Sequence, residues 1–169
     1  MEALAVDGDF AYAPWWRRVL SAVLDSFVIS LLSAPFAGAA VGRLAEAVAE
    51  GGDVSSADLR SVTLTNLFVT VVYMTAMHAW RGSTIGKMAL RTVLVRDDGA
   101  PVSFGTAFVR AVTVAAMQFV SSWLLIPIFV DELWPLGNRR RQTLHDLVAK
   151  TIVVSAASTQ PAAEGAAAK

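Results

Sequence analysis

An arginine and an aspartate stand two helical turns apart in the first long hydrophobic segment of the chain. Arg18 and Asp25 are seven residues apart, so on an α-helix they share one face, roughly 10 Å apart along the axis. An acid inside a membrane helix costs about 2.5 to 3.5 kcal/mol unless it is paired, hydrated or protonated, so such acids are functional candidates. Two interpretations stay open: a functional site, and a structural hydrogen bond to a neighbouring helix.

The segment that carries this pair, Trp15 to Gly42, is long and apolar enough to cross a bilayer, for which about 20 residues suffice. Of the 169 residues, 55% are hydrophobic, and the mean hydropathy is +0.53. These values are typical of an integral membrane protein. The formal net charge is zero and cysteine is absent. The composition therefore gives no indication of a nucleic-acid partner, and it excludes disulfides and thiolate metal sites.

Charged and aromatic residues predict the orientation of this first helix. Trp15 and Trp16 stand where aromatic side chains prefer the headgroup boundary. With Arg17 and Arg18 they place the start of the helix on the cytoplasmic side by the positive-inside rule. The polar connection that follows, residues 43–60, is then expected outside, and Gly51-Gly52 interrupts it.

A second membrane span is predicted over residues 62–80. Its polar residues recur at steps of three and four, so they form a stripe on one helical face that is expected to contact protein. The stripe consists of Thr63, Asn66, Thr70 and Tyr73. Near the inner end, His78 is expected to be a capping or interface residue. Basic residues dominate the next segment, residues 81–98, which is therefore predicted to be cytoplasmic.

The third hydrophobic region, residues 111–136, is predicted to bend back on itself. As a single span it would place Arg139 to Arg141 outside, against the positive-inside rule. The runs Thr92–Arg96 and Thr151–Val154 are too short to be stable alone, and they could pair as a ribbon only if both are cytoplasmic. Because 26 residues are too few for two full spans, we expect re-entrant helices broken near Pro127.

Together these features predict an all-α membrane protein: a small helical bundle of about three to four membrane segments, with a short cytoplasmic two-stranded β-ribbon. We expect a leader over residues 1–14, a membrane domain over 15–154 and a disordered tail over 155–169. Both termini are predicted to be cytoplasmic and the protein multi-pass in the inner (plasma) membrane. Its expected partners are the lipid bilayer and anionic lipid headgroups, which basic residues attract.

Several short motifs, taken in order, resemble the RDD family of bacterial integral membrane proteins. They are an R-x6-D pair at Arg18 and Asp25, T-x-G-K at Thr84 to Lys87, D-G with S-F-G at Asp98 to Gly105, and L-H-D at Leu144 to Asp146. The resemblance covers about residues 15–154. The chain departs from the usual pattern at Ser21, Ile85 and Lys150. The resemblance implies a membrane location and fold, with membrane transport as the suggested role.

Two functional hypotheses follow. In the first, an oligomer of the protein transports a cation, a proton or a small solute, with Asp25 as a protonatable or cation-binding site gated by Arg18. In the second, it is a non-enzymatic assembly or interaction protein whose charges are structural. The charge cluster in both hypotheses is Arg18, Asp25 and Asp146. Secondary candidates are Arg17, Thr84, Gly86, Lys87, Arg110 and His145.

An enzyme is the least favoured class. No HExxH motif, nucleophile elbow or metal-ligand cluster occurs in the sequence. An intramembrane aspartyl protease needs two facing acids within spans, whereas Asp131 stands at a helix end and Asp146 in a basic loop. We therefore expect no enzymatic activity and no cofactor. A homo-oligomer or another membrane protein is an expected partner, because so few spans form a transport path only in an oligomer.

Overall fold

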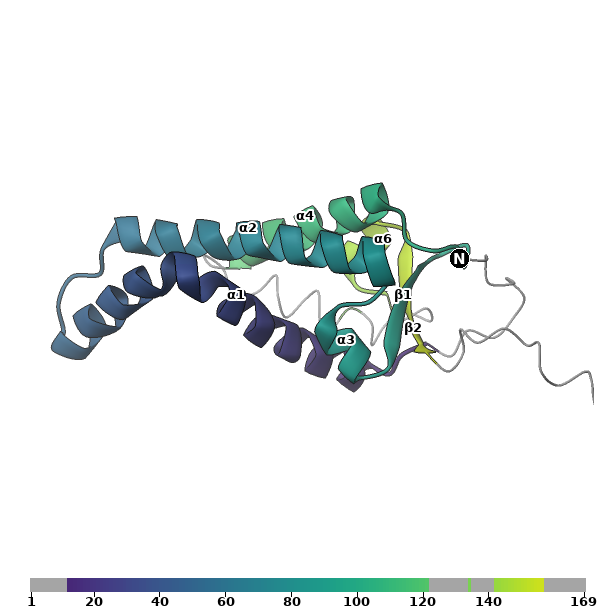
Figure 1. Cartoon of the computed structure of the whole chain (residues 1–169), viewed down its shortest axis with the longest axis horizontal. Helices are drawn as coiled ribbons and strands as arrows, with labels where there is room; N and C mark the ends of the chain where they lie inside the picture. Colours follow the sequence, from purple (N-terminus) through teal and green to yellow (C-terminus); the bar gives the residue numbers. More distant parts are fainter. Residues whose placement is uncertain (1–11, 122–133, 135–141, 157–169) are drawn as a thin grey trace, which may run out of the picture.

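Three long helices pack along one another, and a two-stranded sheet covers one end of them (Figure 1). The structure is a computed structural model that describes residues 12–121, 134 and 142–156. Within these residues, three helices are long and apolar enough to cross a membrane. They are α1 (Trp15–Glu50), α2 (Ser56–Arg81) and α4 (Phe104–Ser121). The short helices α3 (Ile85–Ala89) and α6 (Leu144–Val148) lie at the sheet end.

Helix α1 is longer than predicted. The sequence suggested a polar connection beginning at Arg43, but the helix continues to Glu50 and ends where Gly51 adopts φ 66°. Residues 43–50 include leucine, alanine and glutamate, which favour helix, so the polar composition of this stretch gave a wrong boundary. The extension is fastened to α2 by an ion pair of 2.5 Å between Arg43 and Asp58. Helix α2 accordingly begins at Ser56, six residues before the predicted start.

The polar stripe of α2 faces protein, as predicted. The Ser33 hydroxyl donates to the Asn66 side chain at 3.0 Å, and the Thr70 hydroxyl donates to Gln118 of α4 at 3.3 Å. By contrast, large apolar side chains such as Phe27 and Phe68 are 71% and 70% exposed on the outer surface. Polar groups inside and apolar groups outside are the arrangement expected for helices in lipid.

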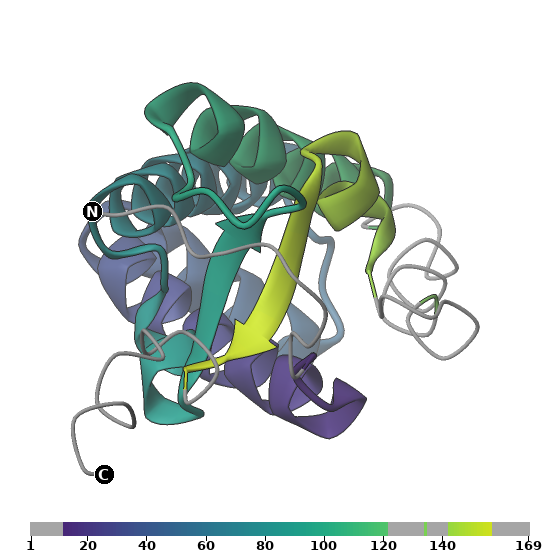
Figure 2. The same cartoon turned by 90° about the vertical axis from the view of Figure 1, so that its right-hand side faces the viewer.

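The predicted ribbon is present. Strand β1 (Thr92–Arg96) pairs antiparallel with β2 (Thr151–Ser155), with Leu94 opposite Val153. Figure 2 shows these two strands lying across the end of the helix bundle. The end of the predicted leader joins this sheet, because the Ala13 N–H donates to the Val153 carbonyl at 3.1 Å and Ala13 is fully buried.

The direction of the described helices agrees with an even number of membrane crossings between the two strands. Helix α4 starts at the sheet end and runs away from it, and α6 and β2 lie at that end again (Figure 1). The predicted break near Pro127 falls outside the described residues. The predicted tail after Ser155 also lies almost wholly outside them.

Candidate functional site

The first turns of α1 present a buried polar face at the sheet end of the bundle. Arg18, Ser21 and Asp25 lie on this face and are 7%, 2% and 1% exposed. Their spacing of three and four residues places them on one stripe of the helix, as the sequence predicts. The rest of the molecule must therefore supply partners for an arginine and a carboxylate that water does not reach.

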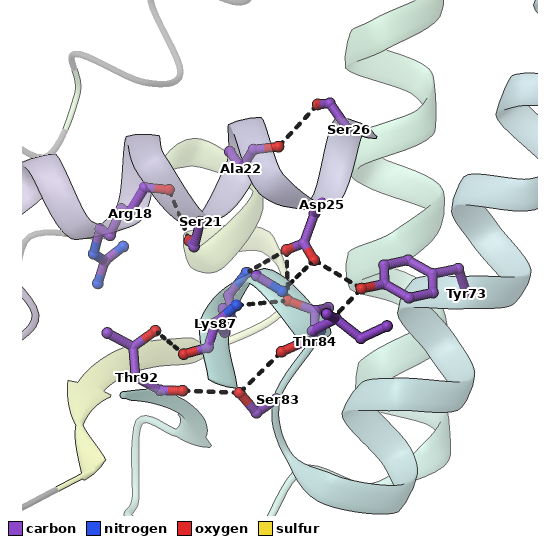
Figure 3. Close-up of polar contacts among 12 residues, drawn as sticks. Arg18, Ser21, Ala22, Asp25, Ser26, Tyr73, Ser83, Thr84, Lys87 and Thr92 are labelled. Atoms are coloured by element: carbon purple, nitrogen blue, oxygen red, sulfur yellow. Dashed lines mark hydrogen bonds and ion pairs between the residues drawn. The ribbon is translucent and has the colours of Figure 1, made fainter. Parts of the chain in front are cut away.

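Asp25 is held by three hydrogen bonds (Figure 3). Its Oδ1 accepts from the Tyr73 hydroxyl at 2.7 Å and from the Gly86 backbone N–H at 2.8 Å. Its Oδ2 accepts from the Thr84 hydroxyl at 2.5 Å, and the Lys87 ammonium lies 4.0 Å away. Both oxygens of the acid are thus satisfied by groups from α2 and from the segment that follows it.

The T-x-G-K motif forms the loop and first turn that grip this carboxylate. Thr84 is the N-cap of α3, and its hydroxyl also accepts from the Lys87 N–H at 3.4 Å. Gly86 has to be glycine, because an added Cβ would lie 2.2 Å from the Ser21 carbonyl oxygen and 2.9 Å from the Asp25 carboxyl carbon. The T-x-G-K segment therefore binds the side-chain carboxylate of Asp25.

Arg18 turns to a different acid. Its Nη1 donates to Asp146 Oδ2 at 2.8 Å, and its Nη2 donates to the Val153 carbonyl at 3.3 Å. Arg110 of α4 approaches the same carboxylate and donates to Asp146 Oδ1 through Nε at 3.1 Å and Nη2 at 2.9 Å. Asp146 is completely buried, so one carboxylate joins two arginines from two long helices in a low-dielectric site.

Helix α6 fixes the orientation of Asp146. Thr143 is its N-cap, and the Thr143 hydroxyl and the Asp146 carboxylate form a reciprocal capping box. His145 is also buried, and its Nε2 lies 2.8 Å from Arg110 Nη2. Because a guanidinium can only donate, Nε2 of His145 acts as the acceptor, which assigns the proton to Nδ1. The histidine thus adds a second acceptor for Arg110, beside Asp146.

Burial and neighbouring charges shift two ionisable groups of this cluster that lie outside the long helices. Burial lowers the pKa of Lys87 to about 8, and the nearby Arg110 charge acts in the same direction. Burial acts to raise the pKa of Asp146, but the charges of Arg110 and Arg18 lower it well below its ordinary value. Asp146 is therefore ionised at neutral pH, and Lys87 still carries its charge there.

Arg18 and Asp25, which the first hypothesis couples as gate and binding site, bind different partners. The two side chains share a face of α1, but Arg18 is engaged by Asp146 and Asp25 by Tyr73, Thr84 and Gly86. Figure 3 shows the Asp25 carboxylate beside Tyr73 and Thr84, with Arg18 farther along the helix. Two helical turns are too far for a direct ion pair, and closer partners arrive from other elements.

The structure brings the other candidates together with one exception. Thr84, Gly86, Lys87, Arg110 and His145 all lie within the network around the two carboxylates. Arg17 points elsewhere, since its guanidinium carbon lies 5.3 Å from the centre of the Trp16 ring.

Sequence reasoning missed two members of the network. Tyr73 was assigned only to the stripe of α2, although its hydroxyl also accepts from the Ile85 N–H at 2.9 Å while it donates to Asp25. Thr143 received no role. A signal for it was available, because a threonine with an acid three residues later is the signature of a capping box.

Two adjoining cavities lie between the long helices. The first, about 130 Å³, opens beside the charged cluster and is lined by Arg18, Asp25, Lys87 and Arg110, among others. The second, about 260 Å³, lies farther from the sheet and is lined by hydroxyl and amide side chains including Ser30, Thr63 and Asn66. Both are lined by Ser26, Ile29 and Gln118. The two cavities together therefore extend from the stripe of α2 to the charged cluster.

No metal centre is evident in the part of the chain that the structure describes, where no group of three histidine, aspartate or glutamate side chains is placed to hold an ion. The groups around the first cavity are instead donors and carboxylates already joined to each other. Chemically, the arrangement can bind or release a proton, hold a small ion or stabilise the bundle.

Comparison with known proteins identifies the family. Proteins called "Proline-rich antigen homolog" from two strains of Mycobacterium tuberculosis are 28% identical over 161 residues. The match covers 85% of this chain and 63% of each relative, so the chain spans less than two thirds of their length. No solved structure matches the sequence. The sequence model of the RDD family matches residues 12–150, which include every charged residue of the cluster, and the chain therefore belongs to the RDD family of membrane proteins.

Proposed function

We propose that this protein is a small, non-enzymatic transport protein in which a small solute or ion moves between α1, α2 and α4. The observation that carries the proposal is the pair of adjoining cavities, which share Ser26, Ile29 and Gln118 as lining residues. Polar side chains inside a membrane bundle are costly and commonly line a pathway. Their continuity from the middle of α2 to the charged cluster supports a route along the helices.

In this proposal the charged cluster forms the inner end of the route. Asp25 does not act as an open cation site, because three donors and the Lys87 ammonium already occupy its surroundings. A passing solute would instead meet the cavity faces of Lys87 and Arg110. Short-range movement of α3, which carries Lys87, would open or close this end. The solute must be small, since the first cavity holds about 130 Å³.

A flux assay tests the proposal. The full chain would be reconstituted in liposomes and the release of protons, sodium, potassium and chloride measured separately. Asn66→Leu places an apolar side chain in the second cavity, whereas Ser61→Leu changes an exposed position of the same helix and serves as control. We expect flux of at least one of these ions with the wild type and the control, and a loss with Asn66→Leu. If liposomes with the protein release all four ions no faster than protein-free liposomes, the proposal is wrong.

The proposed orientation places the sheet end and both termini in the cytoplasm of the inner membrane. Its support is the excess of basic residues around the sheet. The chain has no cysteine, so single introduced thiols can report the side. With an impermeant thiol reagent, Ser56→Cys should react in intact cells and Asp98→Cys only after permeabilisation. The opposite pattern would invert the orientation.

A second candidate is a membrane assembly or interaction protein in which the cluster is structural. The observation in its favour is that each carboxylate fastens α1 to a different short helix, Asp25 to α3 and Asp146, through Arg18, to α6. A protein of this kind would form oligomers or bind a membrane partner, show no flux, and lose its native assembly when Asp25 or Asp146 is replaced. Mass determination of the detergent-solubilised wild type and variants, beside the flux assay, distinguishes the two.

A further inference from the structure

The two carboxylates beside the first cavity already accept hydrogen bonds from other residues. Asp146 accepts from Arg18 and Arg110, and Asp25 accepts from Tyr73, Thr84 and Gly86. A metal cation entering the cavity would have to displace these donors, each of which is buried. The carboxylates therefore leave little capacity for a positively charged ligand.

Hydrogen-bond donors remain on the same cavity wall. The Lys87 ammonium, whose side chain is 9% exposed, lies 4.0 Å from Asp25 Oδ2, too far for a hydrogen bond. Arg110 Nη1 is buried and lacks a hydrogen-bond partner among the described residues. Both residues line the cavity. A buried donor on a charged group that has no hydrogen-bond partner is costly, so Arg110 Nη1, with the Lys87 ammonium lining the same cavity, indicates that an acceptor occupies it.

The charge balance agrees with this indication. In the described part of the cluster, three cations, Arg18, Lys87 and Arg110, surround two carboxylates, Asp25 and Asp146. At neutral pH Lys87 keeps its charge, because its pKa is lowered only to about 8. The cluster then carries one positive charge in excess, in a site where uncompensated charge is strongly disfavoured.

We infer that the first cavity is a binding site for one small monovalent anion, such as a halide, nitrate or formate, held between Lys87 and Arg110. Its volume of about 130 Å³ admits a simple anion. The apolar side chains of Ile29, Met74 and Val114 also line the cavity, and burial beside them reduces the screening of a bound charge. The site stands independently of the proposed transport, since an anion can bind without crossing the membrane.

Anion-dependent unfolding of the purified full chain tests this site. Thermal unfolding in a nonionic detergent would be recorded at constant ionic strength while sodium gluconate is replaced by sodium chloride. Because a ligand bound only to the native state raises the midpoint, chloride should raise it, and the rise should saturate with concentration. Lys87→Gln should lose the rise, whereas Lys150→Gln, which alters an exposed lysine, should keep it. Coincident chloride and gluconate curves for the wild type, or an unchanged rise in Lys87→Gln, would overturn the inference.

A second measurement needs no variant, so it tests the site even if Lys87→Gln fails to fold. The chloride-35 NMR line should broaden in the presence of wild-type protein and should narrow again when formate or nitrate competes. Absence of protein-dependent broadening would overturn the site. Competition by nitrate but not formate would identify inorganic anions as the ligands, and competition by both would include small carboxylates. Neither result bears on ion flux in liposomes, so failure of the anion site and failure of the transport proposal are separable.

Discussion

Helices α3 and α6 are two copies of one local structure that bind opposite charges. Each has five residues and a threonine N-cap, Thr84 in α3 and Thr143 in α6. Three residues after the threonine stands Lys87 in the first helix and Asp146 in the second. The first copy holds the Asp25 carboxylate of α1, and the second holds arginines of α1 and α4. The third residue after the threonine, Lys87 or Asp146, thus has the charge opposite to that of the side chain that each copy binds.

The likeness extends into the strands. Each short helix is followed by a basic residue with positive φ, Arg91 at 53° and Lys150 at 51°. A five-residue strand then begins with threonine. In the antiparallel pairing, Leu94 lies opposite Val153, and these are equivalent positions, since each is ten residues after its N-cap threonine. The two copies are therefore related by an approximate two-fold axis through the sheet.

The difference between the copies lies in how closely α1 approaches. Gly86 of α3 corresponds to His145 of α6, two residues after each threonine. At Gly86 the α1 backbone leaves no space for a side chain. At His145 a full imidazole fits and contacts Arg110. The first copy binds Asp25 at close range through the Gly86 backbone N–H. The second copy binds the arginines through the side chains of His145 and Asp146.

The largest effect is expected for Gly86→Ala. The new Cβ would lie 2.2 Å from the Ser21 carbonyl oxygen, which is backbone and cannot rotate away. Helices α1 and α3 would have to separate, with loss of the Asp25 hydrogen bonds. We expect little or no monodisperse protein in size-exclusion chromatography. Gly38→Ala is the matched control, because nothing lies within 4 Å of its Cβ, and alanine favours helix by about 0.5 to 1 kcal/mol. Normal yield of Gly86→Ala would mean that the close approach is wrong.

Asp146→Asn should have the next largest effect. It leaves two buried arginines without their anion, for which a loss of about 3 to 5 kcal/mol in the free energy of unfolding is expected. Asp98→Asn provides the control, because the Arg96–Asp98 pair is about half exposed and should contribute less than about 1 kcal/mol. Denaturant titration in mixed micelles gives both values.

The Asp146 site also has a pH signature. Because its pKa in the folded protein is lowered from 3.8, the stability it contributes is complete above that value and is lost as the pH falls below it. Wild-type unfolding free energy should therefore decline on acidification in this range, and Asp146→Asn should lack that component. Identical acid profiles for the two proteins would count against the buried ion pairs.

A smaller loss, about 1 to 3 kcal/mol, is expected for Asp25→Asn. The N–H groups of the asparagine amide would face the donors that bind Asp25. Lys87, left without its carboxylate, can release its proton, whereas the arginines beside Asp146 cannot. Adding Lys87→Met to Asp25→Asn should restore part of the stability. If the double variant recovers no stability, the charge of Lys87 does not account for the loss in Asp25→Asn, and the two copies do not differ in this respect.

A further effect concerns Lys87 at high pH. Its pKa is lowered from 10.5 to about 8 in the folded state, so the unfolded chain binds more protons between these values. Stability should therefore rise as the pH increases from about 8 to 10.5. Lys87→Met should flatten this rise, while Lys150→Met should not. Thermal unfolding across this pH range provides the measurement, and a rise that persists in Lys87→Met would assign it to another group.

The sequence predicted elements and faces better than side-chain partners. Hydrophobic length gave the long helices, three-and-four spacing gave the face of Asn66 and Thr70, and β-branched runs gave the paired strands, because these are local properties. The sequence grouped Arg18 with Asp25 and Asp146 but did not decide its partner, because Asp146 is 128 residues away and reaches it only through the packing of α6. The end of α1 was misjudged because charged residues near a membrane surface remain compatible with helix.

Arg18 is joined to Asp146 across the bundle and not to Asp25 on its own helix. Double-mutant cycles with Arg18→Gln, Asp146→Asn and Asp25→Asn measure this coupling directly through unfolding free energies in micelles. We expect a coupling between Arg18 and Asp146 above about 1 kcal/mol, and one between Arg18 and Asp25 within about 0.5 kcal/mol of zero. The reverse order would contradict the account and restore the direct pairing along α1.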